Sequence, residues 1–214
     1  MFPDYQTFKL VKASTFQQIP YFRYMHKGRL EAFSDGVIAI IITIMVLDLK
    51  APMGNDLTAL KSVIPTLTSY VLSFIFVGIY WNNHHHLIHT VKTVSGGILW
   101  ANLHLLFWLS LVPFFTRWMG QNNFSSLTVA SYGVVLLLSA IAFTILIRAI
   151  IAHHGKDSTL AKAVGDDKKG NISLACYAVA IPLSFVHPAI GYSFYILVAF
   201  IWLVPDKRIE KVMD

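Results

Sequence analysis

The sequence predicts an all-α membrane protein with six transmembrane helices, and three observations support this fold class. Hydrophobic residues make up 56% of the 214 residues and charged residues only 13%, and the mean hydropathy is +0.60. Apolar runs recur along the chain, and its length suffices for about six helices of roughly 20 residues each. Lysine and arginine are concentrated in alternate connections between these runs. Together these features exclude an ordinary soluble domain.

Six apolar runs between polar breaks mark the predicted spans. They cover residues 30–49, 64–89, 98–118, 125–151, 171–187 and 188–204. Local signals support several of the boundaries. Pro65 suits the start of the second helix, Ser125 and Ser126 are suited to cap the fourth, and His187-Pro188 predicts a tight reversal between the last two. Pro205 is expected to end the sixth helix.

The distribution of lysine and arginine predicts the orientation in the membrane. Of the 17 Lys and Arg residues, only Lys50, Lys61 and Arg117 fall on the side opposite the termini. The positive-inside rule therefore predicts that both termini are cytoplasmic. We attribute the net charge of +6 to this orientation and expect no nucleic acid as a partner.

The chain is accordingly divided into three predicted parts. Residues 1–28 form a basic N-terminal extension, residues 29–205 form the transmembrane domain, and residues 206–214 form a cytoplasmic tail. The multi-pass integral membrane class rests on the middle part alone.

The first predicted helix carries a narrow apolar stripe that contains one hydroxyl group. At about 100° per residue, Ile40, Thr43, Ile44 and Leu47 share one face with the spacing of a coiled-coil seam. The pattern by itself favours plain helix packing, with Thr43 bonded back to its own helix. A pore lining stays open as the alternative, in which several copies around an axis form rings of isoleucine and leucine with one ring of hydroxyls.

Polar residues mark both ends of this first helix. Arg29, Ser34 and Asp35 lie within one to two turns of the predicted cytoplasmic end, where they can stay hydrated or bond to neighbouring helices. Asp48 lies near the opposite end, where its charge is suited to attract cations.

The stretch "YWNNHHHLIHT" gathers polar residues at the cytoplasmic end of the second helix. They are Trp81, Asn82, His84, His85, His86 and His89. His85 and His89 have the i, i+4 spacing of metal ligands, but neither cysteine nor carboxylate accompanies them in the sequence. We therefore expect interfacial hydrogen bonds rather than a metal or haem. Asn102 and His104 in the third span are expected to bond between helices.

Several motifs are missing, and their absence excludes function classes. The sequence contains no Thr-Val-Gly-Tyr-Gly loop, no arginine repeat in the fourth span, no HExxH and no glycine-rich phosphate loop. We predict neither enzymatic activity nor a cofactor. Two alternatives remain: a carrier in which Asp35 and the histidines relay protons, and a bis-histidine haem protein that uses His85 or His104.

The stretch "RLEAFSDGVIAIIITIMVL" resembles the signature of the transmembrane-protein-175 family of potassium channels, in its prokaryotic branch. The signature is Arg-x-x-x-Phe-Ser-Asp followed by an Ile/Leu-rich first helix. Two more stretches agree: Trp81 followed by His84 and His85, and "ANLHLLFWLSLVPFFTR", which contains Asn102 and Pro113-Phe114.

This resemblance implies a potassium-permeable pore lined by the first helix of each of four units. One copy of the signature per chain then implies a homotetramer, in the plasma membrane of a prokaryote. By the same resemblance, Ile40, Ile44 and Leu47 form the hydrophobic constriction, and Thr43 favours potassium. The implied network of cytoplasmic-side residues comprises Arg29, Phe33, Ser34, Asp35, Trp81, His84 and Asn102.

Overall fold

The computed structural model describes residues 27–165 and 167–203, and the described residues are helical apart from short connections. The N-terminal extension up to residue 26, Pro205 and the predicted tail lie outside the described residues. In chain order the helices are α2 (Lys27–Leu47), α3 (Leu57–His89), α4 (Gly96–Ser110), α5 (Val112–Gln121), α6 (Ser126–His154), α7 (Thr159–Val164), α8 (Lys168–Val186) and α9 (Pro188–Leu203).

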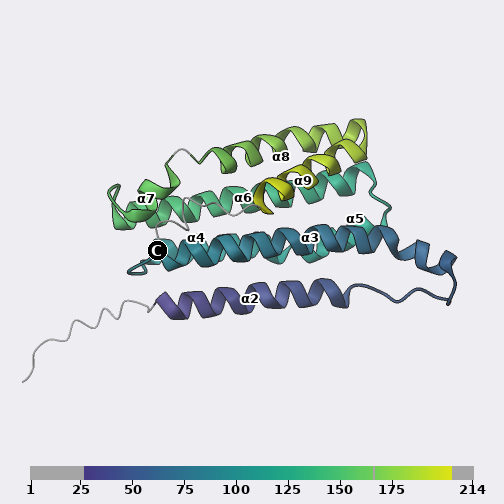
Figure 1. Cartoon of the computed structure of the whole chain (residues 1–214), viewed down its shortest axis with the longest axis horizontal. Helices are drawn as coiled ribbons and strands as arrows, with labels where there is room; N and C mark the ends of the chain where they lie inside the picture. Colours follow the sequence, from purple (N-terminus) through teal and green to yellow (C-terminus); the bar gives the residue numbers. More distant parts are fainter. Residues whose placement is uncertain (1–26, 166, 204–214) are drawn as a thin grey trace, which may run out of the picture.

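The long helices run side by side in one bundle, with α2 along one edge (Figure 1). α2 packs against α3, α4 and α5, whereas α8 packs against α6 and α9 at the other side of the bundle. This arrangement leaves one side of α2 without a neighbour from its own chain.

Five segments of the described chain are long and apolar enough to cross a membrane. They are Lys27–Leu47, Leu57–His89, Gly96–Gln121, Ser126–His154 and Lys168–Val186. The segment predicted as the sixth span forms α9, which has 16 residues and is therefore about 24 Å long. The prediction of an all-α membrane protein is thus confirmed at the level of fold class.

The start of α3 differs from the predicted start at Pro65. α3 begins two turns earlier, at Leu57, because the Asp56 carboxylate accepts a hydrogen bond of 2.8 Å from the Ala59 backbone N–H. Pro65 lies inside the helix instead. Its missing N–H leaves the carbonyl of Lys61 without a helical donor, which is tolerable because Lys61 is exposed.

The third predicted span is divided into two helices at Leu111. Pro113 lies in the first turn of α5, where a missing N–H costs no helical hydrogen bond. At the fourth span, Ser125 is the N-cap of α6 as predicted, but its hydroxyl pairs with the Thr128 hydroxyl at 3.0 Å rather than with a backbone N–H. The reversal at His187-Pro188 is confirmed, since α8 ends at Val186 and α9 begins at Pro188.

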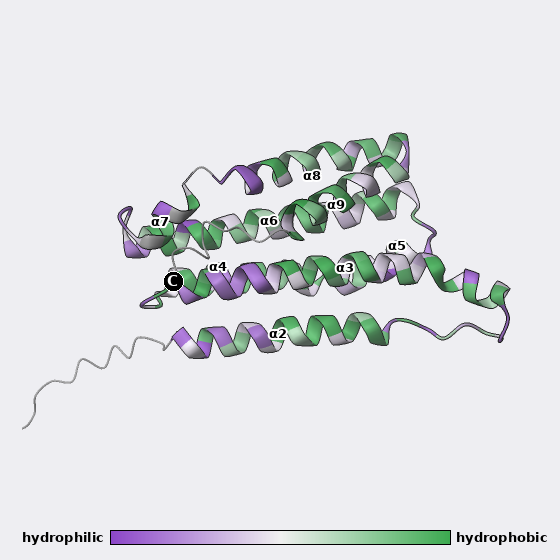
Figure 2. Cartoon of the chain, in the orientation of Figure 1, coloured by the Kyte–Doolittle hydropathy of each residue, from purple (hydrophilic) through white to green (hydrophobic). Residues whose placement is uncertain are grey.

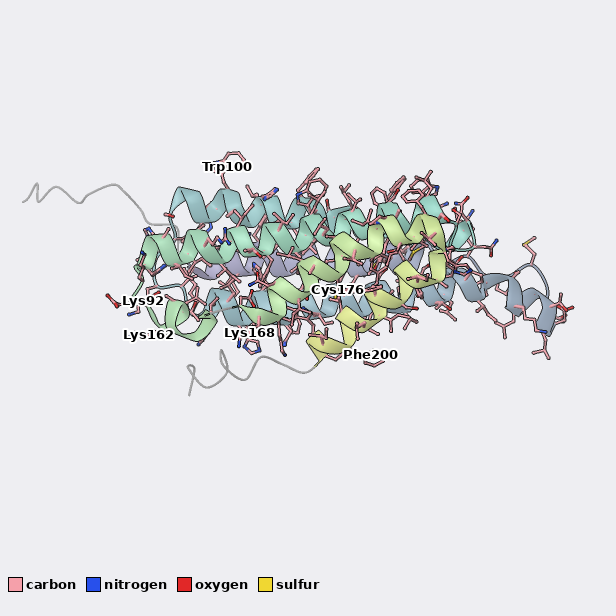
Figure 3. All side chains as sticks on the ribbon, turned by 90° about the horizontal axis from the view of Figure 1, so that it is seen from above. Lys92, Trp100, Lys162, Lys168, Cys176 and Phe200 are labelled. Atoms are coloured by element: carbon pink, nitrogen blue, oxygen red, sulfur yellow. The ribbon has the colours of Figure 1, made fainter. Side chains whose placement is uncertain are left out.

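The bundle exposes apolar side chains on opposite sides, as expected for a protein surrounded by lipid. Trp100 on α4 and Phe200 on α9 are 75% and 63% exposed and point to opposite sides (Figure 3). Lys92, Lys162 and Lys168 lie toward one end of the bundle in the same view. The polar residues of α2 and α3 gather at that end as well (Figure 2).

Small side chains allow α3 and α5 to pack closely at the opposite end. A Cβ atom added to Gly120 on α5 would lie 2.7 Å from the Cα of Thr66 on α3, closer than real Cβ atoms approach backbone. A buried polar cluster joins the same helices, since Thr116 donates to the Ser73 hydroxyl at 2.6 Å and Ser73 pairs with Tyr132 of α6 at 2.9 Å.

We expect Gly120→Ala to destabilise the bundle by about 1–3 kcal/mol, because the added methyl group overpacks the α3–α5 contact. Thermal unfolding of the purified protein measures this. Gly78→Ala is the matched control, since a Cβ there meets no atom within 4 Å. Equal melting temperatures for the two variants would contradict the close packing at Gly120.

Candidate functional site

α2 has two different apolar faces. One is buried against the bundle and consists of Leu30, Ser34, Ile38, Ile41 and Met45, spaced three to four residues apart. The other carries Ile40, Thr43, Ile44 and Leu47, the residues that we call the α2 stripe. Ile40, Ile44 and Leu47 are 58%, 45% and 80% exposed, and Thr43 is also exposed. The α2 stripe therefore faces away from its own chain.

The Thr43 hydroxyl is tied to its own helix. It lies 2.8 Å from the carbonyl oxygen of Ala39 and 2.9 Å from that of Ile40, so its proton is directed to the backbone. Such a bond leaves the lone pairs of the hydroxyl oxygen available as acceptors.

A groove separates the α2 stripe from the junction of α4 and α5. It is lined by Val37, Ile40, Ile41, Ile44, Asp48, Ser110, Pro113, Phe114 and Arg117. Phe114 is 62% exposed, so Pro113-Phe114 flanks the α2 stripe as part of the same apolar surface.

Behind the α2 stripe, a buried hydrogen-bond chain joins three helices. His84 Nε2 on α3 lies 2.8 Å from Asn102 Oδ1 on α4, and Asn102 Nδ2 donates to the Ser34 hydroxyl on α2 at 2.9 Å. Ser34 in turn donates to the Leu30 carbonyl at 2.8 Å. His84, Asn102 and Ser34 are each no more than 1% exposed. Because Ser34 spends its proton on Leu30, the chain has one direction, with His84 as the first donor.

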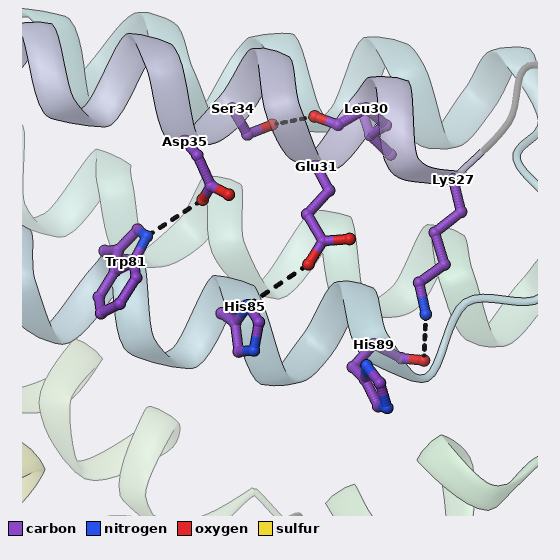
Figure 4. Close-up of polar contacts among 8 residues, drawn as sticks. All are labelled: Lys27, Leu30, Glu31, Ser34, Asp35, Trp81, His85 and His89. Carbon is purple, nitrogen blue, oxygen red and sulfur yellow. Dashed lines mark hydrogen bonds and ion pairs between the residues drawn. The ribbon is translucent and has the colours of Figure 1, made fainter.

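A second set of contacts joins α2 to α3 nearer the surface, and we call it the α2–α3 ladder (Figure 4). Its contacts repeat every four residues along both antiparallel helices. Trp81 Nε1 donates to Asp35 Oδ1 at 3.1 Å, His85 Nδ1 lies 3.4 Å from Glu31 Oε1, and Lys27 Nζ donates to the His89 carbonyl at 2.8 Å.

The ladder corrects the expectation that no carboxylate accompanies the histidines. Glu31 reaches His85 from the neighbouring helix, which a search along the second span alone does not detect. His85 and His89 do share a face, as predicted, with ring centroids 6.4 Å apart. Within residues 27–165 and 167–203, however, no group of three or more His, Cys, Asp or Glu side chains is placed to hold a metal ion.

Other predicted residues lie outside these contacts. Arg29 and Phe33 are exposed, and in the described part of the chain neither hydrogen-bonds to the buried chain or the ladder. His104 was expected to bond between helices, but its Nε2 accepts from Trp108 of the same helix at 2.9 Å. Sequence reasoning also missed roles for Lys27 and Glu31, although both lie four residues apart on one helical face with Asp35.

At the opposite end of α2, Asp48 forms an ion pair with Arg117 of α5, with Nη1 and Oδ1 2.9 Å apart. The side chains of Arg117 and Asp48 are 41% and 26% exposed, so the pair is partly hydrated. The signal for this pair was present in the sequence, because Arg117 and Asp48 are both predicted at the same end of the bundle.

We expect Arg117→Met to lower the melting temperature by about 1–3 °C, in keeping with a partly exposed pair worth ~0.5–1 kcal/mol. Lys61→Met, which removes an exposed charge at the same end, serves as the control. The double reversal Asp48→Arg with Arg117→Asp should recover part of the loss. If it is no more stable than Arg117→Asp alone, the pair does not hold α2 to α5.

Comparison with known proteins places this arrangement. The family model described as "Endosomal/lysosomal potassium channel TMEM175" matches residues 29–113, which include most of α2, all of α3 and α4, and the start of α5. A potassium channel of Chryseobacterium sp. (strain P1-3) is 58% identical over 187 residues, which cover 87% of this chain and 97% of that protein.

More distant relatives agree. The crystal structure of a lysosomal potassium-selective channel TMEM175 homolog from Chamaesiphon minutus superposes with a TM-score of 0.75 at 27% identity, covering 84% of this chain and 97% of that one. The human endosomal/lysosomal proton channel TMEM175 is 35% identical over 96 residues, which cover 39% of this chain and 19% of the human protein. The family is one of channels and not of enzymes, in agreement with the prediction. The extent of the Chryseobacterium match and the family model together show that the chain belongs to the TMEM175 family.

Proposed function

We propose that four copies of this chain form a potassium-permeable cation channel whose pore is lined by α2 from each copy. The observation that carries this proposal is the outward orientation of the α2 stripe, since Ile40, Ile44 and Leu47 lack a neighbour from their own chain. Relatives named as potassium channels support the choice of ion.

In this proposal the pore closes by dewetting. Fourfold symmetry converts Ile40, Ile44 and Leu47 into three apolar rings one turn apart, and water leaves a bore only a few ångströms wide when its wall offers no hydrogen bonds. Ions cannot cross a dry segment, because they would lose their hydration without compensation. A small outward movement of the four helices rewets the bore and opens it.

Selectivity is assigned to the ring formed by Thr43. Its hydroxyl oxygens provide acceptors beside an otherwise apolar constriction, and potassium holds its hydration shell less tightly than sodium does. A partly dehydrating constriction therefore penalises sodium more, and we expect a preference for potassium that is weaker than that of a carbonyl filter.

The polar contacts behind α2 hold the pore helix in place. Ser34, Asn102 and His84 fix its rotation from within, while Trp81 and Asp35 fix it from the surface. Arg29 and Phe33 are proposed to act at the cytoplasmic entrance. Asp48 is placed at the outer mouth to attract cations, and its pairing with Arg117 reduces that attraction.

The proposed membrane topology has six spans with α9 as the sixth, and both termini in the cytoplasm of a prokaryotic cell. The lysines at one end of the bundle support this orientation (Figure 3). In the native plasma membrane the 1–28 extension then lies on the cytoplasmic side.

Flux into liposomes that carry the purified protein tests this proposal. Potassium uptake should be fast, should not saturate with concentration, and should exceed sodium uptake, while native mass spectrometry should give a tetramer. Slow flux that saturates and requires a counter-ion would instead indicate a coupled transporter.

A further inference from the structure

The three contacts of the α2–α3 ladder differ in how they respond to protons. The bond from Trp81 to Asp35 and the bond from Lys27 to the His89 carbonyl keep their charges between pH 5 and 8. The contact between His85 and Glu31 does not, because a histidine imidazole is the side chain that ordinarily changes charge in this range. With neutral His85 it is a long hydrogen bond at 3.4 Å, and with protonated His85 it becomes an ion pair.

The surroundings of His85 favour proton binding from the aqueous phase. The side chains of His85 and Glu31 are 45% and 25% exposed, at the end of the bundle where the polar residues gather (Figure 2). The charged and titratable groups that face His85 are Glu31, Asp35 and Lys27 from α2, and His84, His86 and His89 from α3. Two carboxylates against one lysine on the α2 side make that surface receptive to a positive charge.

The position of this contact connects it to the α2 stripe. α3 lies on the buried side of α2, opposite Ile40, Ile44 and Leu47 (Figure 1). A stronger bond between α2 and α3 therefore holds α2 against its own bundle and away from any axis that the α2 stripe faces. Glu31 is also one turn from Ser34, so force applied there acts on the same rigid helix.

We propose that His85 and Glu31 form a proton-binding site that positions the pore helix, so that acid on the cytoplasmic side favours the open pore. This inference rests on the function proposed above. The site takes up one proton per subunit at the imidazole, and His85 acts through Glu31 on α2 without touching the permeating ion.

The test is potassium flux through oriented proteoliposomes with the pH varied only on the cytoplasmic side. We expect flux to rise about two- to fivefold between pH 8 and pH 5.5, the range that a partly exposed ion pair can produce in an equilibrium. Glu31→Gln and His85→Asn should each reduce this rise to less than about 1.5-fold. His89→Asn is the matched control, because His89 joins the ladder only through its backbone carbonyl, and it should keep the wild-type response.

A second measurement tests the proton-binding contact without requiring flux. The difference in melting temperature between wild type and Glu31→Gln should be about 1–2 °C larger at pH 5.5 than at pH 8. The sign follows because the ion pair is present when His85 is protonated and is lost as the pH rises.

The outcomes separate this inference from the function on which it rests. Flux that is independent of pH, that falls with acid, or that responds normally in His85→Asn overturns the proton-binding role and leaves the channel intact. An absence of flux at every pH, in wild type and in Ile40→Asn, overturns the proposed function. Equal melting-temperature differences at both pH values would show that His85 and Glu31 do not form a proton-dependent pair.

Discussion

Ile40→Asn is expected to raise the resting potassium flux of reconstituted protein by about tenfold or more, because it replaces one apolar ring with four amides that hold water. Exclusion of water depends on a continuous apolar wall, and a polar ring interrupts it at its narrowest predicted level. Ile40 is 58% exposed in the single chain, so the substitution removes no core packing and should leave the fold intact. The measurement is potassium uptake into proteoliposomes at matched protein density.

Val46→Asn is the matched control for this experiment. Val46 is 44% exposed on the same helix, but its position is about 120° around the helix from Ile40. If the α2 stripe lines the pore, Val46→Asn should leave the flux near the wild-type value. Equal flux in Ile40→Asn and wild type would remove Ile40 from the constriction, and an equal increase in both variants would indicate a general leak.

Asn102→Ala should destabilise the protein by about 3 kcal/mol and lower its melting temperature by about 5–10 °C, because two polar groups would lose their buried partner. His84 Nε2 would keep a donor without an acceptor, and the Ser34 oxygen would lose the amide that donates to it. Both side chains are sealed from solvent, so water cannot replace Asn102 without a cavity that admits it.

Two further variants make this prediction specific. Asn82→Ala changes a half-buried asparagine of α3 outside the buried chain and should cost less than about 1 kcal/mol. Ser34→Ala should cost less in the Asn102→Ala background than in wild type, because the bond between the two residues is already gone. Independent, fully additive effects would contradict the continuous chain from His84 to Ser34.

The local patterns in the sequence were sufficient for the fold class and for most helix positions. Apolar runs of membrane-spanning length are a property of consecutive residues, and so is the reversal at His187-Pro188. The prediction failed at Pro65 because a proline near the start of an apolar run reads the same whether it begins a helix or lies in its third turn. The deciding signal was the cap at Asp56, one residue ahead of Leu57.

The sequence by itself determined that α2 has a stripe of Ile40, Thr43, Ile44 and Leu47, since the helical period places them on one face. It did not determine whether that stripe is buried or outward, because both faces of α2 are apolar and hydrophobicity cannot rank them. Only the tertiary structure decided this, by packing Leu30, Ile38 and Met45 against the bundle. The same holds for the pairs of Glu31 with His85 and Asp48 with Arg117. Their distances depend on the rotation and register of one helix against another, which no spacing within a single helix encodes.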